Sequence, residues 1–334
     1  MRWSTRASVS TQGRSDVVAG TSQTVAVPTE RRSRLRAIFD SDIFYSFRRS
    51  RLTIVAAIVT FTIVAAALLA PVIATQDPYD LRQLSIIDLH IPPVWQKDGD
   101  VRFLLGTDDQ GRDVFSTILY GSRQSITIGV MATLFAAALG IVLGLIAGYA
   151  GGAIDTVIMR AADIQATFPA ILIAMLVDGT SRALFGSQRN DQVVFYVMVL
   201  SIGLSFWVQY ARTVRGSTLV EKNKDYVLAA RLIGIHPGLI LFRHVLPNVI
   251  GPMLVIATIN LALAVITEAT LSFLGLGLPS TQPSLGTLIQ IGQKYLFAGE
   301  WWIAIFPGVT LAALVLAVNL LGDWLRDALN PRLR

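Results

Sequence analysis

One apolar stretch near the C-terminal end holds the side chains most capable of chemistry. Residues 249–273 contain a single ionisable group, Glu268, together with the amide of Asn260 and the hydroxyl of Thr267. Asn260 and Thr267 are seven residues apart, so they lie nearly on one face of a helix. Two interpretations fit these groups. They line a water-filled passage in which Glu268 attracts a cationic group, or they make hydrogen bonds between packed helices.

The segment 225–248, DYVLAARLIGIHPGLILFRHVLPN, has the features of a protein contact. Its charged residues are too costly for hydrocarbon, so the segment must project from the membrane between two apolar stretches. Ala229 and Ala230 are small enough to let a short helix lie deep in a groove. Gly234 can end that helix in a left-handed conformation, and Pro237 prevents its continuation. Pro247 is tolerated in the first turn of the next helix.

Aromatic and guanidinium groups, which often anchor interfaces, are present in the same segment as Tyr226 and Arg231. We therefore expect a projecting helix that a soluble partner grips. The residues expected to make this contact are Asp225, Tyr226, Ala229, Ala230, Arg231, Gly234, Ile235, His236 and Pro237.

Catalytic chemistry is not indicated. The sequence has no G-x-x-x-x-G-K-[ST] phosphate loop and no cysteine. The three histidines, His90, His236 and His244, do not form a metal-binding set, because His90 is expected on the opposite side of the membrane. We expect no catalytic residue, no metal site and no cofactor bound by this chain.

The composition predicts an all-α integral membrane protein. Of 334 residues, 53% are hydrophobic and 15% are charged, whereas soluble domains are about 25% charged. The net charge of +6 does not indicate nucleic-acid binding, because the positive residues cluster beside apolar stretches.

Six stretches are long and apolar enough to span a bilayer of about 30 Å. Twenty Lys and Arg residues fall on one side of the resulting topology and eight on the other, which predicts that both chain ends are cytoplasmic. Pro169 and Pro252 are expected to kink the third and fifth spans. The spans are expected at about 52–74, 124–150, 154–177, 192–211, 249–273 and 301–321.

The expected organisation has five parts. Residues 1–40 form a flexible tail, 41–75 the first span with its anchor, and 76–123 an extracytoplasmic segment. Residues 124–322 form a five-helix core that includes the cytoplasmic segment 216–246, and 323–334 form a cytoplasmic tail.

The second span carries a small residue at every fourth position. Such a face allows close backbone approach between helices, on which association in lipid relies. The neighbouring helix could belong to this chain or to a partner. The residues are Ala132, Ala136, Gly140, Gly144 and Gly148.

Within the extracytoplasmic segment, Thr107 to Gln110 fit a capping box. The helical spacing of Val114, Phe115, Ile118 and Leu119 predicts a short helix on the membrane surface. The aspartates there are expected to be solvated or capping residues.

From Phe103 onward the chain resembles permease subunits of bacterial ATP-binding-cassette importers for dipeptides and oligopeptides. The family's cytoplasmic loop has the pattern E-A-A, three residues, Gly, nine residues, I-x-L-P. Ala229, Ala230, Gly234, Leu246 and Pro247 match, whereas Leu228 replaces the Glu and His244 the Ile. The other matching stretches are LLGTDDQGRDVFS, GLIAGYAGGAIDTVIMRAADI, LSFLGLGLP, WWIAIFPG and GDWLRDALNPRLR.

The resemblance implies a type I importer permease fold with six transmembrane helices and a cytoplasmic coupling helix. It implies a second homologous permease in a heterodimer, two ATPase subunits or domains that use ATP and Mg, and an extracytoplasmic substrate-binding protein. Permeases for nickel or glutathione share these motifs and stay open as alternatives. A self-powered secondary transporter would need coupling acids near the bilayer midplane and usually inverted repeats, and only Glu268 is available, off centre.

Overall fold

The computed structural model describes residues 47–80, 82–186 and 190–329. The expected flexible tail, residues 1–40, lies outside the described residues. The first span consists of α3, Arg51–Leu68, followed by the short α4, Ala70–Ile73. Ser50 begins α3 by accepting a hydrogen bond from the Thr53 amide at 3.3 Å. The rest of the described chain is helical apart from connections and one isolated antiparallel bridge between Thr107 and Asp113.

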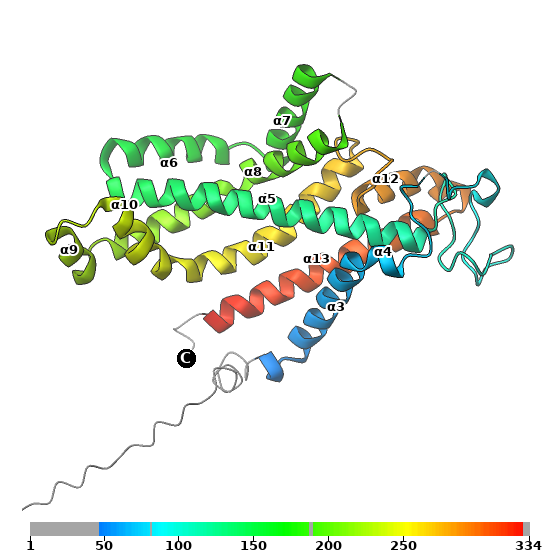
Figure 1. The fold of residues 1–334 in the computed structure, drawn as a ribbon, viewed down its shortest axis with the longest axis horizontal. Coiled ribbons are helices and arrows are strands. Elements are labelled where there is room, and N and C mark those ends of the chain that lie inside the picture. The colour runs from blue at the N-terminus through cyan, green and yellow to red at the C-terminus, as the bar shows by residue number, and fades with distance from the viewer. Residues whose placement is uncertain (1–46, 81, 187–189, 330–334) are drawn as a thin grey trace, which may run out of the picture. The chain divides into compact units, whose positions relative to one another are not determined.

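The remaining membrane helices follow the expected order (Figure 1). Five helical segments in the described residues are long and apolar enough to cross a membrane, and six if the bent pair of α6 and α7 counts as one crossing. The helices are α5, Val114–Ala150; α6, Gly152–Ala166; α7, Ala170–Phe185; α8, Asp191–Glu221; α11, Leu246–Phe273; and α13, Trp302–Leu329.

The third span is broken rather than kinked. The axes of α6 and α7 differ by 95°, and Pro169 stands at the start of α7 with an extended ψ of 137°. A proline disfavours the helical conformation of the preceding residue, which explains why the helix stops here. Pro252, in contrast, lies inside the continuous α11.

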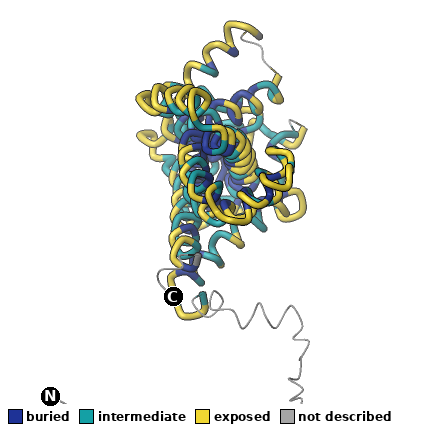
Figure 2. Tube along the Cα trace, turned by 90° about the vertical axis from the view of Figure 1, so that its left-hand side faces the viewer, coloured by how far each residue is buried: buried dark blue, intermediate teal, exposed yellow. Residues whose placement is uncertain are grey.

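The small-residue face of α5 packs against α8 of the same chain. A Cβ atom added to Gly140 would lie 2.4 Å from the Tyr210 Cβ, and one added to Gly144 would lie 2.6 Å from the Ala211 carbonyl oxygen. A Cβ on Gly148 would lie 2.7 Å from the Thr218 Cβ. Ala132 and Ala136 on this face are buried. Figure 2 shows that the buried residues gather in the interior of the helix assembly.

The expected surface helix is not a separate element. Its residues form the first turns of α5, which begins at Val114. The cap is Asp113, whose carboxylate accepts from the Ser116 amide at 3.0 Å, so the proposed capping box at residues 107–110 was wrong. The Thr107 hydroxyl instead donates to the Asp88 carbonyl at 2.6 Å.

Asp108 is buried rather than solvated. It and Arg112 are 1% and 0% exposed, and Arg112 Nε donates to Asp108 Oδ2 at 2.7 Å. Arg112 Nη1 also donates to the Ser280 carbonyl at 2.7 Å. Arg112 therefore links the 76–113 segment to the connection between α11 and α12. Helix α12 spans Leu285–Tyr295.

The last helix, α13, begins one residue after its expected start and continues to Leu329. The expected tail at 323–334 is therefore helical in the part that the structure describes. Near the start of α13, Trp302 and Ile303 pack with Val114 of α5 and with Leu285 and Ile291 of α12. The Trp302 indole donates to the Thr107 carbonyl at 3.1 Å, which fixes this end of the assembly.

Candidate functional site: the segment between α8 and α11

The projecting segment is a short helix, α9, Asp225–Leu232, followed by a tight turn. Gly234 has a φ of 84°, which confirms the left-handed helix end expected there. The Gly234 amide donates to the Arg231 carbonyl at 3.0 Å and the Ile235 amide to the Ala230 carbonyl at 3.1 Å. This pair of bonds is a Schellman motif, in which glycine is favoured because it has no Cβ.

After the turn the chain re-enters a helix. The His236 side chain accepts from the Gly238 amide at 3.2 Å, and Pro237 opens α10, Pro237–Ile240. A π-helical turn, η2, Leu241–Val245, then leads into α11. His236 therefore has a local structural role as a helix cap.

The two faces of α9 differ sharply. Val227 and Ala230 are 0% and 5% exposed and belong to the main core with Ile240 and Val245. Leu232 and Ile233 at the end of the helix are 89% and 78% exposed. One face thus locks α9 onto its own chain, and the tip presents apolar side chains outward.

This arrangement separates the two alanines expected to enter a groove together. Ala229 is exposed, whereas Ala230 faces the core of this chain. Adjacent helical residues cannot share a face, because each residue turns the helix by about 100°. Asp225 is also exposed, in the first turn of α9, where a negative charge is favourable.

Tyr226 fastens α9 to the two neighbouring helices. Its hydroxyl donates to the Glu221 carboxylate at the end of α8 and accepts from Asn248 Nδ2 in α11 at 3.1 Å. Asn248 Nδ2 also donates to the His244 carbonyl at 2.7 Å. Burial and the Glu221 carboxylate raise the pKa of Tyr226 to about 12, so the phenol keeps its proton and its donor role at neutral pH.

Basic residues extend this network to α5. The Arg231 guanidinium lies 4.6 Å from the centre of the Tyr149 ring, a cation–π contact. Lys222 Nζ donates to the Gly148 carbonyl at 2.7 Å at the end of α5. The interface anchors expected at Tyr226 and Arg231 are therefore occupied within this chain, where they join α9 to α5, α8 and α11.

The π-helical turn accommodates Pro247. Proline has no amide proton and its ring clashes with the carbonyl four residues earlier in an α-helix. The Leu246 amide donates to the Leu241 carbonyl, five residues back, so the turn is widened directly before the proline. Pro247 thus occupies the first turn of α11, as expected.

The polar groups of α11 are enclosed. Asn260 and Glu268 are both 0% exposed, and Glu268 Oε1 accepts from the Ser272 hydroxyl at 2.7 Å. Thr267 is half-buried and its hydroxyl donates to the Leu263 carbonyl at 2.8 Å. The structure therefore buries Asn260 and Glu268 within this chain and leaves Thr267 half-buried, so the three side chains do not share one exposed face.

Glu268→Gln is expected to leave transport close to the wild-type rate. Glutamine keeps the shape of the side chain and an acceptor for Ser272, and the group is enclosed. Glu268→Leu should instead lower thermal stability in detergent, because it leaves the Ser272 hydroxyl without this acceptor. Uptake into proteoliposomes checks the first variant, and a large loss of uptake there would restore the lining interpretation.

Four residues of the network were not identified from the sequence. Tyr149, Glu221, Lys222 and Asn248 all contact α9 or its flanks. The contacts from Tyr149 and Gly148 come from a helix more than 70 residues away. Only the closeness of Glu221 to Tyr226 in the chain offered a local signal.

The segment and its membrane helices agree with one known class of protein. Residues 140–334 match the family described as the binding-protein-dependent transport system inner membrane component. Residues 41–93 match the N-terminal transmembrane domain of oligopeptide transport permease C. The chain belongs to this family of inner-membrane permeases, and it is a multi-pass transport component.

Relatives of known name span nearly the same length. The chain is 36% identical to the dipeptide transport system permease protein DppC of Haemophilus influenzae, over 88% of this chain and 95% of that protein. It is 38% identical to the di/tripeptide permease DppC of Pseudomonas aeruginosa, over 81% and 85%. It is 35% identical to the oligopeptide permease OppC of Bacillus subtilis, over 88% and 90%.

A solved structure supports the fold. An inward-facing form of the MetNI methionine ABC transporter aligns with a TM-score of 0.50 at 19% identity, covering 64% of this chain and 96% of that chain. Together with the family match, the similarity confirms the all-helical type I importer fold expected from the sequence.

Proposed function

We propose that this chain is the permease half of an ATP-driven peptide importer, and that α9 is the coupling helix through which ATPase motion reaches the membrane. The peptide cargo is supported by the names of its relatives, which transport dipeptides, tripeptides or oligopeptides. Residues 124–322 would form the transporting core.

The main support for the coupling role is the difference between the two sides of α9. Its inner face and Tyr226 hold it firmly to three core helices, while Leu232 and Ile233 stand exposed at its tip. A helix that moves a membrane domain needs a rigid connection on one side and a docking surface on the other. Asp225, Ala229, Gly234, His236 and Pro237 are exposed on α9 or the turn after it, and Ile235 in that turn is partly buried against the core.

The remaining assembly follows from this role. Two ATPase subunits bind ATP and Mg and grip α9 and its counterpart on a second, homologous permease. An extracytoplasmic binding protein delivers the peptide at the opposite end. The α9 end and both chain ends then face the cytoplasm, in agreement with the distribution of Lys and Arg.

Affinity purification of the tagged chain from its native host tests the assembly. We expect a second permease and the ATPases to co-purify, and Leu232→Glu to reduce recovery of the ATPases about tenfold, because it places a charge in an apolar contact. Ile87→Glu is the matched control, since Ile87 is 90% exposed and lies outside α9. Equal recovery of ATPases with both variants would contradict docking at α9.

Uptake into proteoliposomes identifies the cargo. With ATP enclosed and the binding protein outside, labelled dipeptide should accumulate, and unlabelled dipeptide should compete where nickel and glutathione do not. If nickel or glutathione inhibited the uptake of labelled dipeptide and unlabelled dipeptide did not, the peptide assignment would be wrong. Uptake driven by a proton gradient without ATP would show a secondary transporter.

A further inference from the structure

Two adjoining cavities lie at the N-terminal end of α8, where α5 and the α11–α12 connection also meet. Their volumes are about 420 and 470 Å³, within the range of small-ligand sites. Asp191 and Leu278 line both cavities. The 31 residues of α8 separate this end from α9 by about 46 Å.

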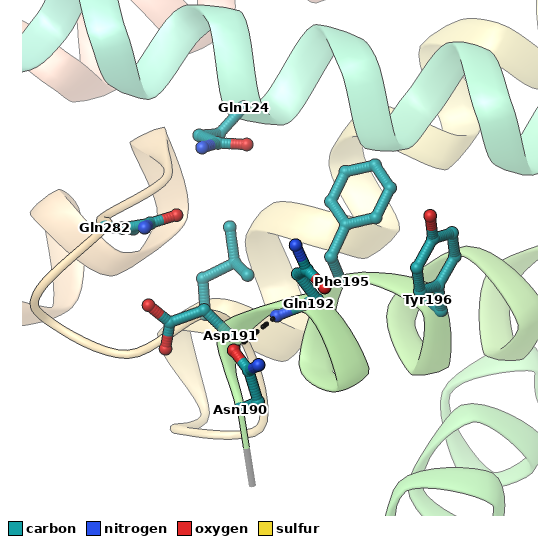
Figure 3. Close-up of a pocket in the computed structure, with 8 residues that line it drawn as sticks. Gln124, Asn190, Asp191, Gln192, Phe195, Tyr196 and Gln282 are labelled. Carbon is teal, nitrogen blue, oxygen red and sulfur yellow. Dashed lines mark hydrogen bonds between the residues drawn. The ribbon is translucent and has the colours of Figure 1, made fainter.

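The first cavity is lined by side-chain amides and aromatic rings. Gln124 of α5, Gln192 of α8 and Gln282 of the α11–α12 connection face a common space, with Phe195 and Tyr196 beside them (Figure 3). An amide side chain both donates and accepts hydrogen bonds, so it can bind the N–H and C=O of a ligand's peptide bond. Such binding does not depend on the ligand's side chains. The aromatic rings add apolar surface.

The second cavity carries charges of both signs. Asp109 and Asp191 are its acids, and Arg182 and Lys294 are its bases. Arg182 is already paired, since its Nε donates to Asp178 at 2.7 Å. Among the described residues, neither the Asp191 carboxylate nor the Lys294 ammonium makes an ion pair, so one unpaired group of each sign is available.

Asp109 is less suited than Asp191 to hold a cation. Its Oδ2 lies 3.4 Å from the Tyr295 hydroxyl. Burial and the neighbouring Asp108 charge raise the pKa of Asp109. Asp191 lines both cavities, so it can hold one end of a ligand whose remaining atoms extend into either cavity.

We propose that these cavities form a membrane-side receiving site for short peptides with free ends. The α-ammonium is held at Asp191, the first side chain and first peptide bond lie against the amides and rings of the first cavity, and the rest of the peptide crosses the second cavity to place its carboxylate at Lys294. This inference rests on the proposed function, and it adds a cargo contact in the permease itself. Such a site would select for two charged termini and tolerate different side chains.

Photolabelling of the assembled transporter tests the site. The complete complex is placed in nanodiscs without the binding protein and exposed to an Ala–photoleucine–Ala probe, and labelled residues are mapped by mass spectrometry. Labels are expected within 192–196 and 278–282. Asp191→Asn should reduce them about tenfold, the effect of losing one charge-assisted contact.

Probes with one blocked end test separately how the α-ammonium and the carboxylate are bound. The wild type should favour the free probe over its N-acetyl form, and Asp191→Asn should lose that preference alone. Lys294→Gln, at an exposed position, should lose only the preference over the C-amide. Lys97→Gln and Asp98→Asn are matched controls on exposed residues of the 76–113 segment and should keep both preferences.

Uptake by the same complex in proteoliposomes, with ATP enclosed and the binding protein outside, distinguishes the failures. Peptide uptake by the wild type with labels elsewhere, or with labels unaffected by Asp191→Asn, would overturn the receiving site and leave the importer assignment intact. Labels within 192–196 and 278–282 that excess unlabelled dipeptide does not compete away would also overturn it. A wild type that takes up no peptide would overturn the proposed function itself.

Discussion

Gly234→Val is expected to abolish coupling between ATP hydrolysis and uptake while the chain still inserts into the membrane. Gly234 has a φ of 84°, and a β-branched residue there is strained by about 1–3 kcal/mol. No atom lies within 4 Å of a Cβ at this position, so the strain comes from the backbone and not from a clash. The strain is relieved by unwinding the end of α9, which moves Leu232 and Ile233. Uptake per ATP hydrolysed in proteoliposomes should fall about tenfold or more.

Two substitutions isolate the backbone effect. Gly234→Asn should retain most of the uptake, because asparagine adopts the left-handed conformation more readily than other residues. Gly216→Val places the same side chain in open space on α8, where the backbone is helical, and should also keep coupling. Normal uptake by Gly234→Val would contradict the coupling role of α9.

Asp108→Ala is expected to produce the largest loss of stability. It leaves the Arg112 guanidinium, which is 0% exposed, without its carboxylate. Breaking a buried pair in this way typically costs about 3–5 kcal/mol. Thermal unfolding in detergent should show a clear fall in the melting temperature, because the pair joins the 76–113 segment to the α11–α12 connection.

Removing the charges of both Asp108 and Arg112 should recover part of the lost thermal stability. In the double variant Asp108→Ala with Arg112→Met no unpaired charge is buried, so it should be more stable than Asp108→Ala alone. Asp100→Ala breaks the exposed contact with Arg102 in the same segment and should change the melting temperature little. Equal effects of Asp108→Ala and Asp100→Ala would show that burial of the first pair is not important.

The membrane helices were predictable because their signals are local. An apolar run of about 20 residues must span the bilayer whatever surrounds it. The end of α9 was predictable for the same reason, since Gly234 and Pro237 act through their own backbone preferences. The small-residue face indicated close packing, but only the structure identifies α8 as its partner.

Features that depend on distant residues were not predictable. Asp108 resembles a surface residue in the sequence. It is buried in an ion pair with Arg112, whose guanidinium also donates to the Ser280 carbonyl, 168 residues away. Ala230 resembles Ala229 in the sequence, and only the core around Val227 separates their environments. The cavity residues gave no signal because Gln124, Asp191 and Gln282 belong to three separate segments.

The unbroken course of α8 has a mechanical consequence. The same rod carries Asp191 at one end and Glu221, the acceptor for Tyr226, at the other. A continuous hydrogen-bonded cylinder transmits twist as well as displacement, so its two ends cannot be adjusted independently. Alterations beside Asp191 should therefore register as changed resting ATP turnover on the far side of the bilayer, even when no cargo is supplied.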